Sequence, residues 1–273
     1  MERYSVLMSV YIKERPEYLD QSLESMVKQT VMPDEIVVVE DGVLNEGLYK
    51  IIEKYKELYP DIIKTVRSPL NQGLGQALNQ GLKVVRNEFV ARMDSDDISV
   101  ANRCEMQLRA FRHMPELSLV GTQIDEFIEL PTNIVSSRIV PSSYKDIIHF
   151  SRRRSPFNHP TVMFRKSAII QAGGYKAYGR KEDLDLFIRM IHAGHKAINL
   201  KKSYLYYRTD INNLKRRKNW TNCKEYIQIM YGFHKKGWNS TVDMTYIIVG
   251  QLIMCFAPSW IVHKLSIRFL RRV

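Results

Sequence analysis

Hydrophobic positions follow two periodicities along the first hundred residues. Runs rich in valine and isoleucine at 5–10 and 35–39 have the continuous hydrophobicity of strands that are buried on both faces of a parallel sheet. Further strands are expected at 63–68 and 89–93. Between these runs, apolar residues recur at the spacing of an amphipathic helix. Three helices should each bury one face, formed by Leu19, Leu23, Met26 and Val27, by Leu48, Ile51, Ile52 and Tyr55, and by Leu74, Leu78, Leu82 and Val85.

Strands that alternate with helices in this way predict an α/β fold, with a mostly parallel sheet and helices on both faces. Ligands of such sheets bind at the carboxyl ends of the strands. Ser9 and Tyr11 lie at the end of the first strand, Asp41 ends the second, and residues 94–97 follow the fourth. Acidic groups from two strands should therefore meet at one edge of the sheet.

The second half of the chain has weaker patterns. Strands are expected at 119–121 and 161–165, with a loop around Pro131 between them. Apolar residues at helical spacing over 184–191 predict a helix that has Glu182 and Asp183 in its first turn. Carboxylates at this place can simply complement the helix dipole. The functional interpretation is a general base that deprotonates an attacking hydroxyl.

Three carboxylates, those of Asp94, Asp96 and Asp97, follow the fourth strand within four residues. A Mg²⁺ or Mn²⁺ ion that holds a diphosphate needs oxygen ligands and takes one or two carboxylates from the protein. The position at the end of a parallel strand favours such a metal site. The alternative is an acidic turn in which Asp97 or Ser99 caps the next helix.

Other positions leave a structural and a functional interpretation open. Asp41 before Gly42 is an ordinary strand-to-turn pair, or a carboxylate that accepts hydrogen bonds from a nucleobase or a ribose. His159 is a weak candidate, because a lone histidine is more often structural. The glycine-bearing turn at 71–75 lacks the dinucleotide-binding fingerprint, and the sequence contains no Gly-Lys-Ser/Thr phosphate loop. These features disfavour a dehydrogenase and a phosphate-loop ATPase.

Composition and charge narrow the class of protein further. The chain has 273 residues, of which 45% are hydrophobic and 26% charged, as in ordinary soluble globular proteins. Residues 196–273 hold 15 Lys or Arg and 3 Asp or Glu, which accounts for the whole net charge of +12. A neutral body with a basic tail is unlike a uniformly basic nucleic-acid binder. The three separated cysteines indicate a reduced, cytosolic-side protein, and we expect no secretory signal.

Several short segments, in their order along the chain, resemble those of the family-two, inverting nucleotide-sugar glycosyltransferases of the GT-A fold. The resemblance covers about residues 4–208 and is strongest to bacterial enzymes of amylovoran, O-antigen and exopolysaccharide biosynthesis. It implies a Rossmann-like, mostly parallel sheet flanked by helices. The pattern of the tail, described below, adds a C-terminal helical membrane-associating extension to the expected fold. The matching segments are Ser5-Val-Leu-Met-Ser-Val-Tyr11, Gln29-Thr30, Pro33-Asp-Glu-Ile-Val-Val-Val-Glu-Asp41-Gly42, Asn71-Gln-Gly-Leu-Gly-Gln-Ala-Leu-Asn79, Ala91-Arg-Met-Asp-Ser-Asp-Asp-Ile98, Asn158-His-Pro160 and Glu182-Asp-Leu-Asp-Leu-Phe-Ile-Arg189.

The resemblance implies a role for each matching residue. Asp183 is the catalytic base, with Glu182 and His159 as acceptor-side or supporting residues. Asp94 and Asp96 form the family's Asp-X-Asp motif, in which Asp96 ligates Mn²⁺ or Mg²⁺ and Asp94 contacts the ribose or the water shell of the metal. The Gln-X-X-Arg-Trp motif of processive synthases is absent after the base, so we expect transfer of a single sugar. The resemblance also implies that the nucleotide-sugar is held by Asp94 and Asp96 together with Ser9, Tyr11, Asp41, Asn71 and Arg92. Asp41 would contact the uracil.

The basic tail predicts that the protein binds to the surface of a membrane. Residues 246–262 are mostly apolar but number only 17 and include Gln251 and Pro258, whereas a membrane-spanning helix needs about 20 apolar residues. Residues 263–272 are basic and amphipathic. We therefore expect a cytoplasmic protein that is attached peripherally to the inner face of the cytoplasmic membrane. The alternative is a helical cap packed on the catalytic domain.

The sequence thus predicts a catalytic domain at 1–210, with a donor-binding half at about 1–100 and an acceptor-binding half at about 101–210. A basic helical region at 211–273 follows. The expected activity is metal-dependent, inverting transfer of one hexose, glucose or galactose being favoured, from a UDP-sugar to a polyprenyl-diphosphate-linked glycan of a bacterial surface polysaccharide. Two alternatives remain, namely a nucleic-acid-binding protein that uses the basic aromatic tail and a non-catalytic scaffold that binds sugar nucleotides.

Overall fold

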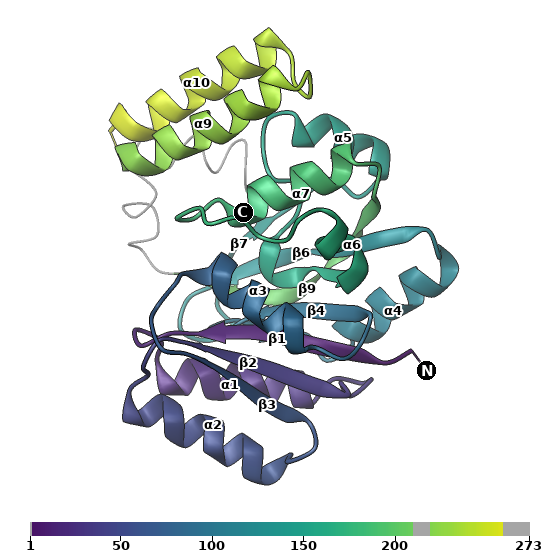
Figure 1. The fold of residues 1–273 in the computed structure, drawn as a ribbon, viewed down its shortest axis with the longest axis vertical. Helices are drawn as coiled ribbons and strands as arrows, with labels where there is room; N and C mark the ends of the chain where they lie inside the picture. The colour runs from purple at the N-terminus through teal and green to yellow at the C-terminus, as the bar shows by residue number, and fades with distance from the viewer. Residues whose placement is uncertain (1, 210–218, 259–273) are drawn as a thin grey trace.

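A computed structural model describes residues 2–209 and 219–258. In these residues a nine-stranded sheet forms the centre of the molecule, with strand order β3-β2-β1-β4-β8-β6-β9-β5 and β7 paired to β6 (Figure 1). The strands are β1 (Tyr4–Val10), β2 (Glu35–Asp41), β3 (Ile63–Ser68), β4 (Phe89–Asp94), β5 (Ile98–Ser99), β6 (Leu117–Phe127), β7 (Ile134–Arg138), β8 (Met163–Arg165) and β9 (Lys196–Arg208).

The first four strands form the parallel half that the hydrophobic pattern predicts. β1 pairs in parallel with β2 and β4, and β2 pairs in parallel with β3. The second half departs from the prediction in two places. The strand expected at 161–165 begins only at Met163, because His159–Thr161 form a 3₁₀ turn, η1. The strand expected at 119–121 lies in the first half of the much longer β6, which pairs in parallel with β9.

Helices cover both faces of the sheet, as predicted. Side chains of α1, α2 and α4 belong to one hydrophobic cluster, and those of α3, α6 and α7 to another on the opposite side of β1 and β2. The predicted helix faces are buried or partly buried in these clusters. The helices are α1 (Pro16–Val27), α2 (Glu46–Leu58), α3 (Leu74–Val84), α4 (Arg103–His113), α5 (Tyr144–Ser151), α6 (Lys166–Gln171) and α7 (Glu182–His192).

The C-terminal helices α9 (Trp220–Lys235) and α10 (Thr241–Phe256) pack on α7 (Figure 1). Leu184 and Ile188 of α7 share a hydrophobic cluster with Ile229, Met230, Phe233, Met244 and Ile247. Within the described ranges, no helix has the length and hydrophobicity needed to span a bilayer. The basic run 215–218 and the amphipathic segment 263–272 lie outside the described residues.

The contact of α3 with β1 and β2 depends on a residue without a side chain. A Cβ on Gly81 would clash with Leu7 and lie 2.9 Å from the Cγ2 atom of Val39. We therefore expect Gly81→Ala to lower the free energy of unfolding by about 1–3 kcal/mol, because the core is overpacked. Gly250→Ala in α10 is the control: no atom lies within 4 Å of its added Cβ, and the helix gains about 0.5–1 kcal/mol. Urea unfolding of both variants tests this, and equal effects would contradict it.

Candidate active site

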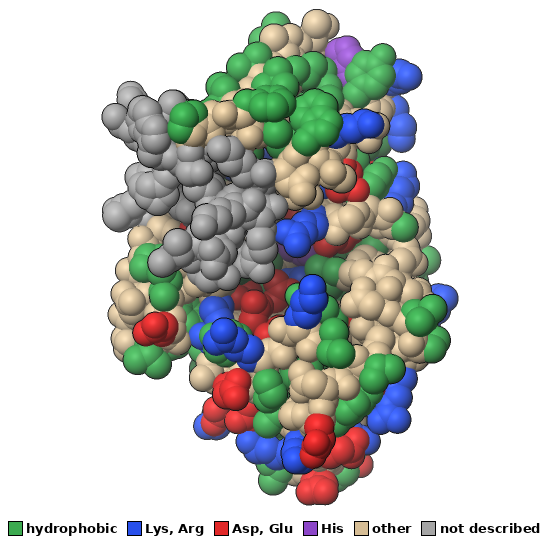
Figure 2. Space-filling model, turned by 90° about the vertical axis from the view of Figure 1, so that its left-hand side faces the viewer, with side chains coloured by type: hydrophobic (Ala, Val, Ile, Leu, Met, Phe, Trp, Pro, Cys, Tyr) green, Lys and Arg blue, Asp and Glu red, His purple; other side chains and the backbone are tan. Residues whose placement is uncertain are grey.

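The strand register aligns the carboxyl ends of β1, β2 and β4. Ser9 of β1 lies beside Asp94 of β4, and Val10 lies beside Glu40 of β2. β2 ends one residue later, at Asp41. Figure 2 looks onto this side of the molecule and shows acidic side chains in a hollow with basic side chains around it. The convergence of residues that the sequence placed at strand ends is therefore observed.

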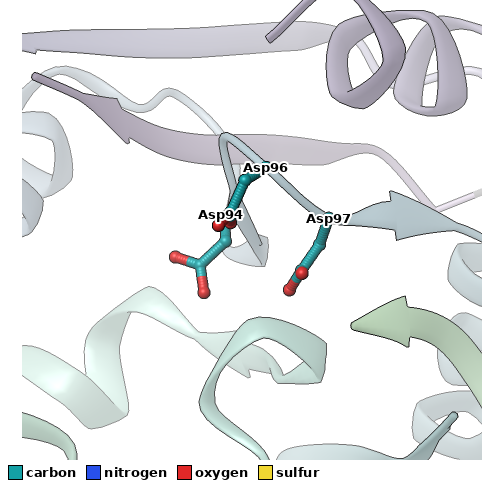
Figure 3. A group of neighbouring side chains, drawn as sticks. All are labelled: Asp94, Asp96 and Asp97. Carbon is teal, nitrogen blue, oxygen red and sulfur yellow. The ribbon is translucent and has the colours of Figure 1, made fainter. Parts of the chain in front are cut away.

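The acidic turn after β4 gathers three carboxylates. One ligand oxygen from each of Asp94, Asp96 and Asp97 lies within 4.8 Å of the others (Figure 3). Asp94 and Asp96 are partly buried and Asp97 is fully buried. The alternative in which Asp97 or Ser99 caps the next helix is wrong, because α4 begins only at Arg103 with Asn102 before it.

Close carboxylates in a poorly hydrated place favour their protonated forms. Burial, followed by the charges of Asp94 and Glu14, raises the pKa of Asp96 to about 7. Burial and the two neighbouring aspartates also raise the pKa of Asp97, whose buried Oδ2 atom has no hydrogen-bond partner among the described residues. A divalent cation among the oxygens would relieve this repulsion, so the residues present fit such an ion.

Arg208, the last residue of β9, holds the acidic turn in place. Its backbone N–H donates to Asp97 Oδ1 (2.9 Å), and its Nε donates to the carbonyl oxygen of Asp96 (2.8 Å). Its guanidinium also lies over the rings of Tyr18 and Phe127, 3.9 and 4.6 Å from their centroids. This role could not be predicted from local patterns, because 112 residues separate Arg208 from Asp96.

Asp41 joins the end of β2 to the glycine-bearing turn. Its two carboxylate oxygens accept the backbone N–H groups of Gln72 (2.7 Å) and Gly73 (3.0 Å). The exposed Asn71 donates from Nδ2 to the Asp41 carbonyl oxygen (3.3 Å). Tyr11 is 42% exposed beyond the end of β1. The residues expected to bind the nucleotide thus border one edge, and their nucleotide contacts stay a prediction.

Glu182 and Asp183 begin α7 close to the first turn of α3. A Cβ on Gly75 of α3 would lie 3.1 Å from the Cβ of Glu182, so glycine permits this approach. Asp183 is partly exposed, whereas Glu182 is buried and its Oε2 atom has no hydrogen-bond partner in the part of the chain that the structure describes. Burial, followed by the charge of Asp183, raises the pKa of Glu182 to about 7. The more hydrated Asp183 is thus the better placed of the two to meet a substrate.

The buried guanidinium of Arg92 acts on both carboxylate sites, through an ion pair with Asp94 and through the effect of its charge on Glu182. Arg92 is 1% exposed and its guanidinium pairs with Asp94, while Nε and Nη1 have no hydrogen-bond partner within residues 2–209 and 219–258. His159 shares a 3.0 Å hydrogen bond between its Nε2 and the Tyr175 hydroxyl. Burial and the charge of Arg92 lower the pKa of His159, so this histidine stays neutral and acts as a support.

Tyr175 was not identified from the sequence, although it packs beside Glu182 against Gly75 of α3 and shares a hydrogen bond with His159. Burial raises the pKa of its phenol, and the charges of Arg92, Glu182, Asp183 and Asp94 all act on it. Its backbone is fixed by Asn79 of α3, which accepts from the Tyr175 N–H (2.9 Å) and donates to the Tyr175 carbonyl (2.7 Å). Such an amide clamp between distant segments has no signature in a single sequence.

A comparison with family models decides the assignment of the chain. Residues 5–179 match the model of glycosyl transferase family 2. The chain belongs to this family. A family-2 relative from Erwinia amylovora, an amylovoran biosynthesis glycosyltransferase, is 38% identical over 83% of this chain and 84% of its own length. An Escherichia coli relative named UDP-Gal:alpha-D-GlcNAc-diphosphoundecaprenol beta-1,3-galactosyltransferase is 32% identical over 98% of both chains.

Solved structures confirm the GT-A fold that the resemblance implied. S. aureus TarS 1-349 in complex with UDP-GlcNAc matches 98% of this chain and 73% of its own, with a TM-score of 0.65 and 18% identity. A mannosyltransferase from Pyrobaculum calidifontis in complex with GDP-Man and Mn²⁺ matches 97% of this chain and 75% of its own, with a TM-score of 0.64 and 15% identity. The family-2 chain thus shares the fold of known nucleotide-sugar enzymes.

The buried Glu182 predicts a pH dependence of stability. Because its folded pKa of about 7 is above the ordinary value, the folded state holds a proton that the unfolded state loses between pH 4.5 and 7. This carboxyl therefore destabilises the fold progressively as the pH rises through that range. We expect the free energy of unfolding of Glu182→Gln, relative to that of wild type, to increase by on the order of 2 kcal/mol when the pH is raised from 5 to 8. Urea unfolding without metal at the two pH values measures this change.

The exposed Glu57 provides the control for this measurement. Glu57→Gln should show the same difference from wild type at both pH values, because its carboxylate is exposed on α2. A pH-independent effect of Glu182→Gln would show that the Glu182 carboxyl is not destabilised in the folded protein.

Proposed function

We propose that the chain transfers a single hexose, with inversion and with a divalent metal, from a UDP-sugar to a polyprenyl-diphosphate-linked glycan of a bacterial surface polysaccharide. Glucose and galactose are the favoured sugars. The observation that carries the proposal is a pair of carboxylate sites: the acidic turn after β4, where Asp94 pairs with Arg92, and the start of α7, which packs against Gly75 of α3. The acidic turn suits a metal ion that holds a diphosphate, and the start of α7 suits a group that accepts a proton.

In the donor site, Asp96 and Asp94 would hold Mn²⁺ or Mg²⁺. When bound, the ion stabilises negative charge on the departing diphosphate. Asp94 is oriented by Arg92, and the backbone of Asp96 is fixed by Arg208, so the carboxylates are set before the donor arrives. Ser9, Tyr11, Asp41 and Asn71 border the same edge and would hold the nucleotide, with Asp41 toward the uracil.

Asp183 would take the proton of the acceptor hydroxyl as its oxygen attacks the anomeric carbon. Attack from the side opposite the diphosphate inverts the configuration, and the departing diphosphate needs no proton. Only one base is therefore required. Glu182, with its raised pKa, keeps a second negative charge from accumulating beside Asp183 near neutral pH. His159 and Tyr175 support the site through their shared hydrogen bond.

The identity of the substrates is proposed from relatives. One curated relative is named for transfer from UDP-Gal to a GlcNAc-diphosphoundecaprenol acceptor, and a solved structure with the same fold contains UDP-GlcNAc. The family assignment also favours a transferase over the nucleic-acid-binding alternative. The scaffold alternative predicts donor binding without turnover and is separated by the first experiment below.

We further propose that α10 attaches the protein peripherally to the inner face of the cytoplasmic membrane. Its packed side carries Met244 and Ile247, and apolar side chains also gather over α9 and α10 on the face drawn in Figure 2. A lipid-linked acceptor would be reached from such a surface. The stripe on the outer side of α10 is formed by Val242, Tyr246, Val249, Ile253 and Phe256, which are 40–71% exposed.

The first experiment separates donor binding from transfer. Asp183→Asn should lower transfer from a UDP-hexose to a sugar-diphosphate lipid by about 10²–10⁴-fold, because the hydroxyl loses its base. The affinity for UDP with Mn²⁺, measured by calorimetry, should be unchanged. Asp61→Asn, at an exposed position before β3, is the matched control and should keep full activity. Normal turnover by Asp183→Asn would refute the assignment of the base.

The second experiment tests the membrane surface. Replacing both Val249 and Ile253 with glutamate should abolish co-sedimentation with phosphatidylglycerol vesicles, because charges replace the exposed apolar stripe. Leu58→Glu on α2 is the control, since Leu58 is 61% exposed at the other end of the molecule (Figure 1). Point variants are preferable to truncation, because α10 also contributes to the cluster with α7. Unchanged sedimentation of the double variant would contradict attachment through α10.

A further inference from the structure

Two of the three cysteines lie in the C-terminal helices. Cys223 is in the first turn of α9, Cys255 is in the last turn of α10, and both are free thiols. Cys223 is 1% exposed, whereas Cys255 is partly exposed. The third cysteine, Cys104 of α4, is buried in the separate hydrophobic cluster of α1, α2 and α4. Of the three thiols, that of Cys255 is therefore the most accessible in the described part of the chain.

The packing of α9 against α10 determines which residues of the two helices face each other. A short turn at 236–240 joins the helices, so they run antiparallel and side by side (Figure 1). Met230 of α9 and Ile247 of α10 belong to one hydrophobic cluster. Cys223 lies about two helical turns before Met230 on the same face of α9. Cys255 lies about two helical turns after Ile247, so the two cysteines lie opposite each other.

Contacts at the open end of the helix pair agree with this register. The rings of Trp220, at the start of α9, and Phe256, at the end of α10, lie with their centroids 6.0 Å apart. Cys223 follows Trp220 by about one helical turn. Cys255 directly precedes Phe256. A side-chain hydrogen bond joins Cys223 and Cys255, so the two sulfur atoms are neighbours between the helices.

The two thiols differ in their surroundings. Burial, followed by the charge of Cys255 and the hydrogen bond with it, raises the pKa of the Cys223 thiol, which stays protonated near neutral pH. Oxidants attack thiolates that solvent can reach, so the partly exposed Cys255 is the thiol that an oxidant meets first. Cys223 is then the thiol beside it, in the position of a resolving cysteine.

We propose that Cys255 and Cys223 form a reversible intramolecular disulfide when the protein meets a peroxide. Hydrogen peroxide oxidises the Cys255 thiol to a sulfenic acid and is itself reduced to water and the sulfenic oxygen. The Cys223 sulfur then attacks the Cys255 sulfur, the S–O bond breaks, and the hydroxyl leaves as a second water with the proton of the Cys223 thiol. The two thiols lose two electrons and two protons, which the peroxide takes up. A dithiol reductant restores both thiols by exchange.

The disulfide fastens the open end of the helix pair, at the opposite end from the turn at 236–240. The same end carries Phe256 of the exposed apolar stripe. Glu225, in the turn after Cys223, accepts the backbone N–H of Gly179 (2.8 Å), which belongs to the loop before α7. Oxidation therefore fixes a part of the chain that contacts the support of α7 and holds the end of the stripe.

Mass spectrometry of the full chain tests the proposal. The purified wild type is treated with hydrogen peroxide, its free thiols are alkylated under denaturing conditions, and its peptides are identified without reduction. The expected product is a peptide pair linked through Cys223 and Cys255, with Cys104 alkylated. Dithiothreitol should restore all three thiols. Amide hydrogen exchange over 252–256 should be slower in the oxidised protein, because the last turn of α10 then opens less often.

Variants of each cysteine separate the roles of the two thiols. Cys223→Ala should stop at the Cys255 sulfenic acid, which dimedone traps, and its hydrogen exchange over 252–256 should not slow on oxidation. In Cys255→Ala the rate of oxidation of Cys223 should fall at least about tenfold, because this thiol is buried and protonated. Cys104→Ala is the matched control and should form the disulfide as wild type does. Thermal unfolding by circular dichroism checks that all variants are folded.

Two results would overturn the proposal. One is the absence of the linked peptide pair in oxidised wild type, including the case in which Cys255 instead joins two copies of the chain. The other is oxidation of Cys223 at the same rate with and without Cys255, which would show that Cys255 is not the first thiol to react. Neither readout depends on sugar transfer, so the proposed function is tested separately.

Discussion

The hold of Arg208 on the acidic turn is the interaction on which the candidate site depends. Three carboxylates within 4.8 Å repel one another, and burial makes each charge more costly. Arg208 offsets this by bonding the Asp97 carboxylate and the Asp96 carbonyl while its guanidinium is enclosed by Tyr18 and Phe127. Because Arg208 ends β9, the second half of the sheet fixes the geometry of a turn that belongs to the first half.

A similar dependence between distant segments positions the start of α7. Asn79 of α3 clamps the backbone of Tyr175, and Gly75 allows both Tyr175 and Glu182 to pack closely against α3. On the other side of α7, Leu184 and Ile188 pack on the C-terminal helices, and Tyr226 of α9 lies against the same cluster. The two carboxylates at the start of α7 are thus held by contacts with both α3 and the C-terminal helices.

Local patterns predicted the parts of this arrangement that depend on local physics. Buried parallel strands are continuously apolar and amphipathic helices are periodic, so the first four strands, three helices and the strand-end aspartates could be found from the sequence. Asp97 shows the limit: the helix cap that the sequence left open as an alternative is wrong, and the backbone partner of its carboxylate is Arg208, far along the chain. Tyr175 likewise has a position that depends on tertiary contacts, those with Asn79. A single tyrosine carries no signal of such contacts in one sequence.

The central claim is that the acidic turn binds the donor's diphosphate through a divalent ion. Calorimetric titration of UDP into the wild-type protein, with Mn²⁺ and then with the metal removed by a chelator, tests it most directly. The account predicts binding with Mn²⁺ and an affinity at least about tenfold lower without it, because the carboxylates would then repel the diphosphate. Equal affinity under both conditions would contradict the metal role of Asp94 and Asp96.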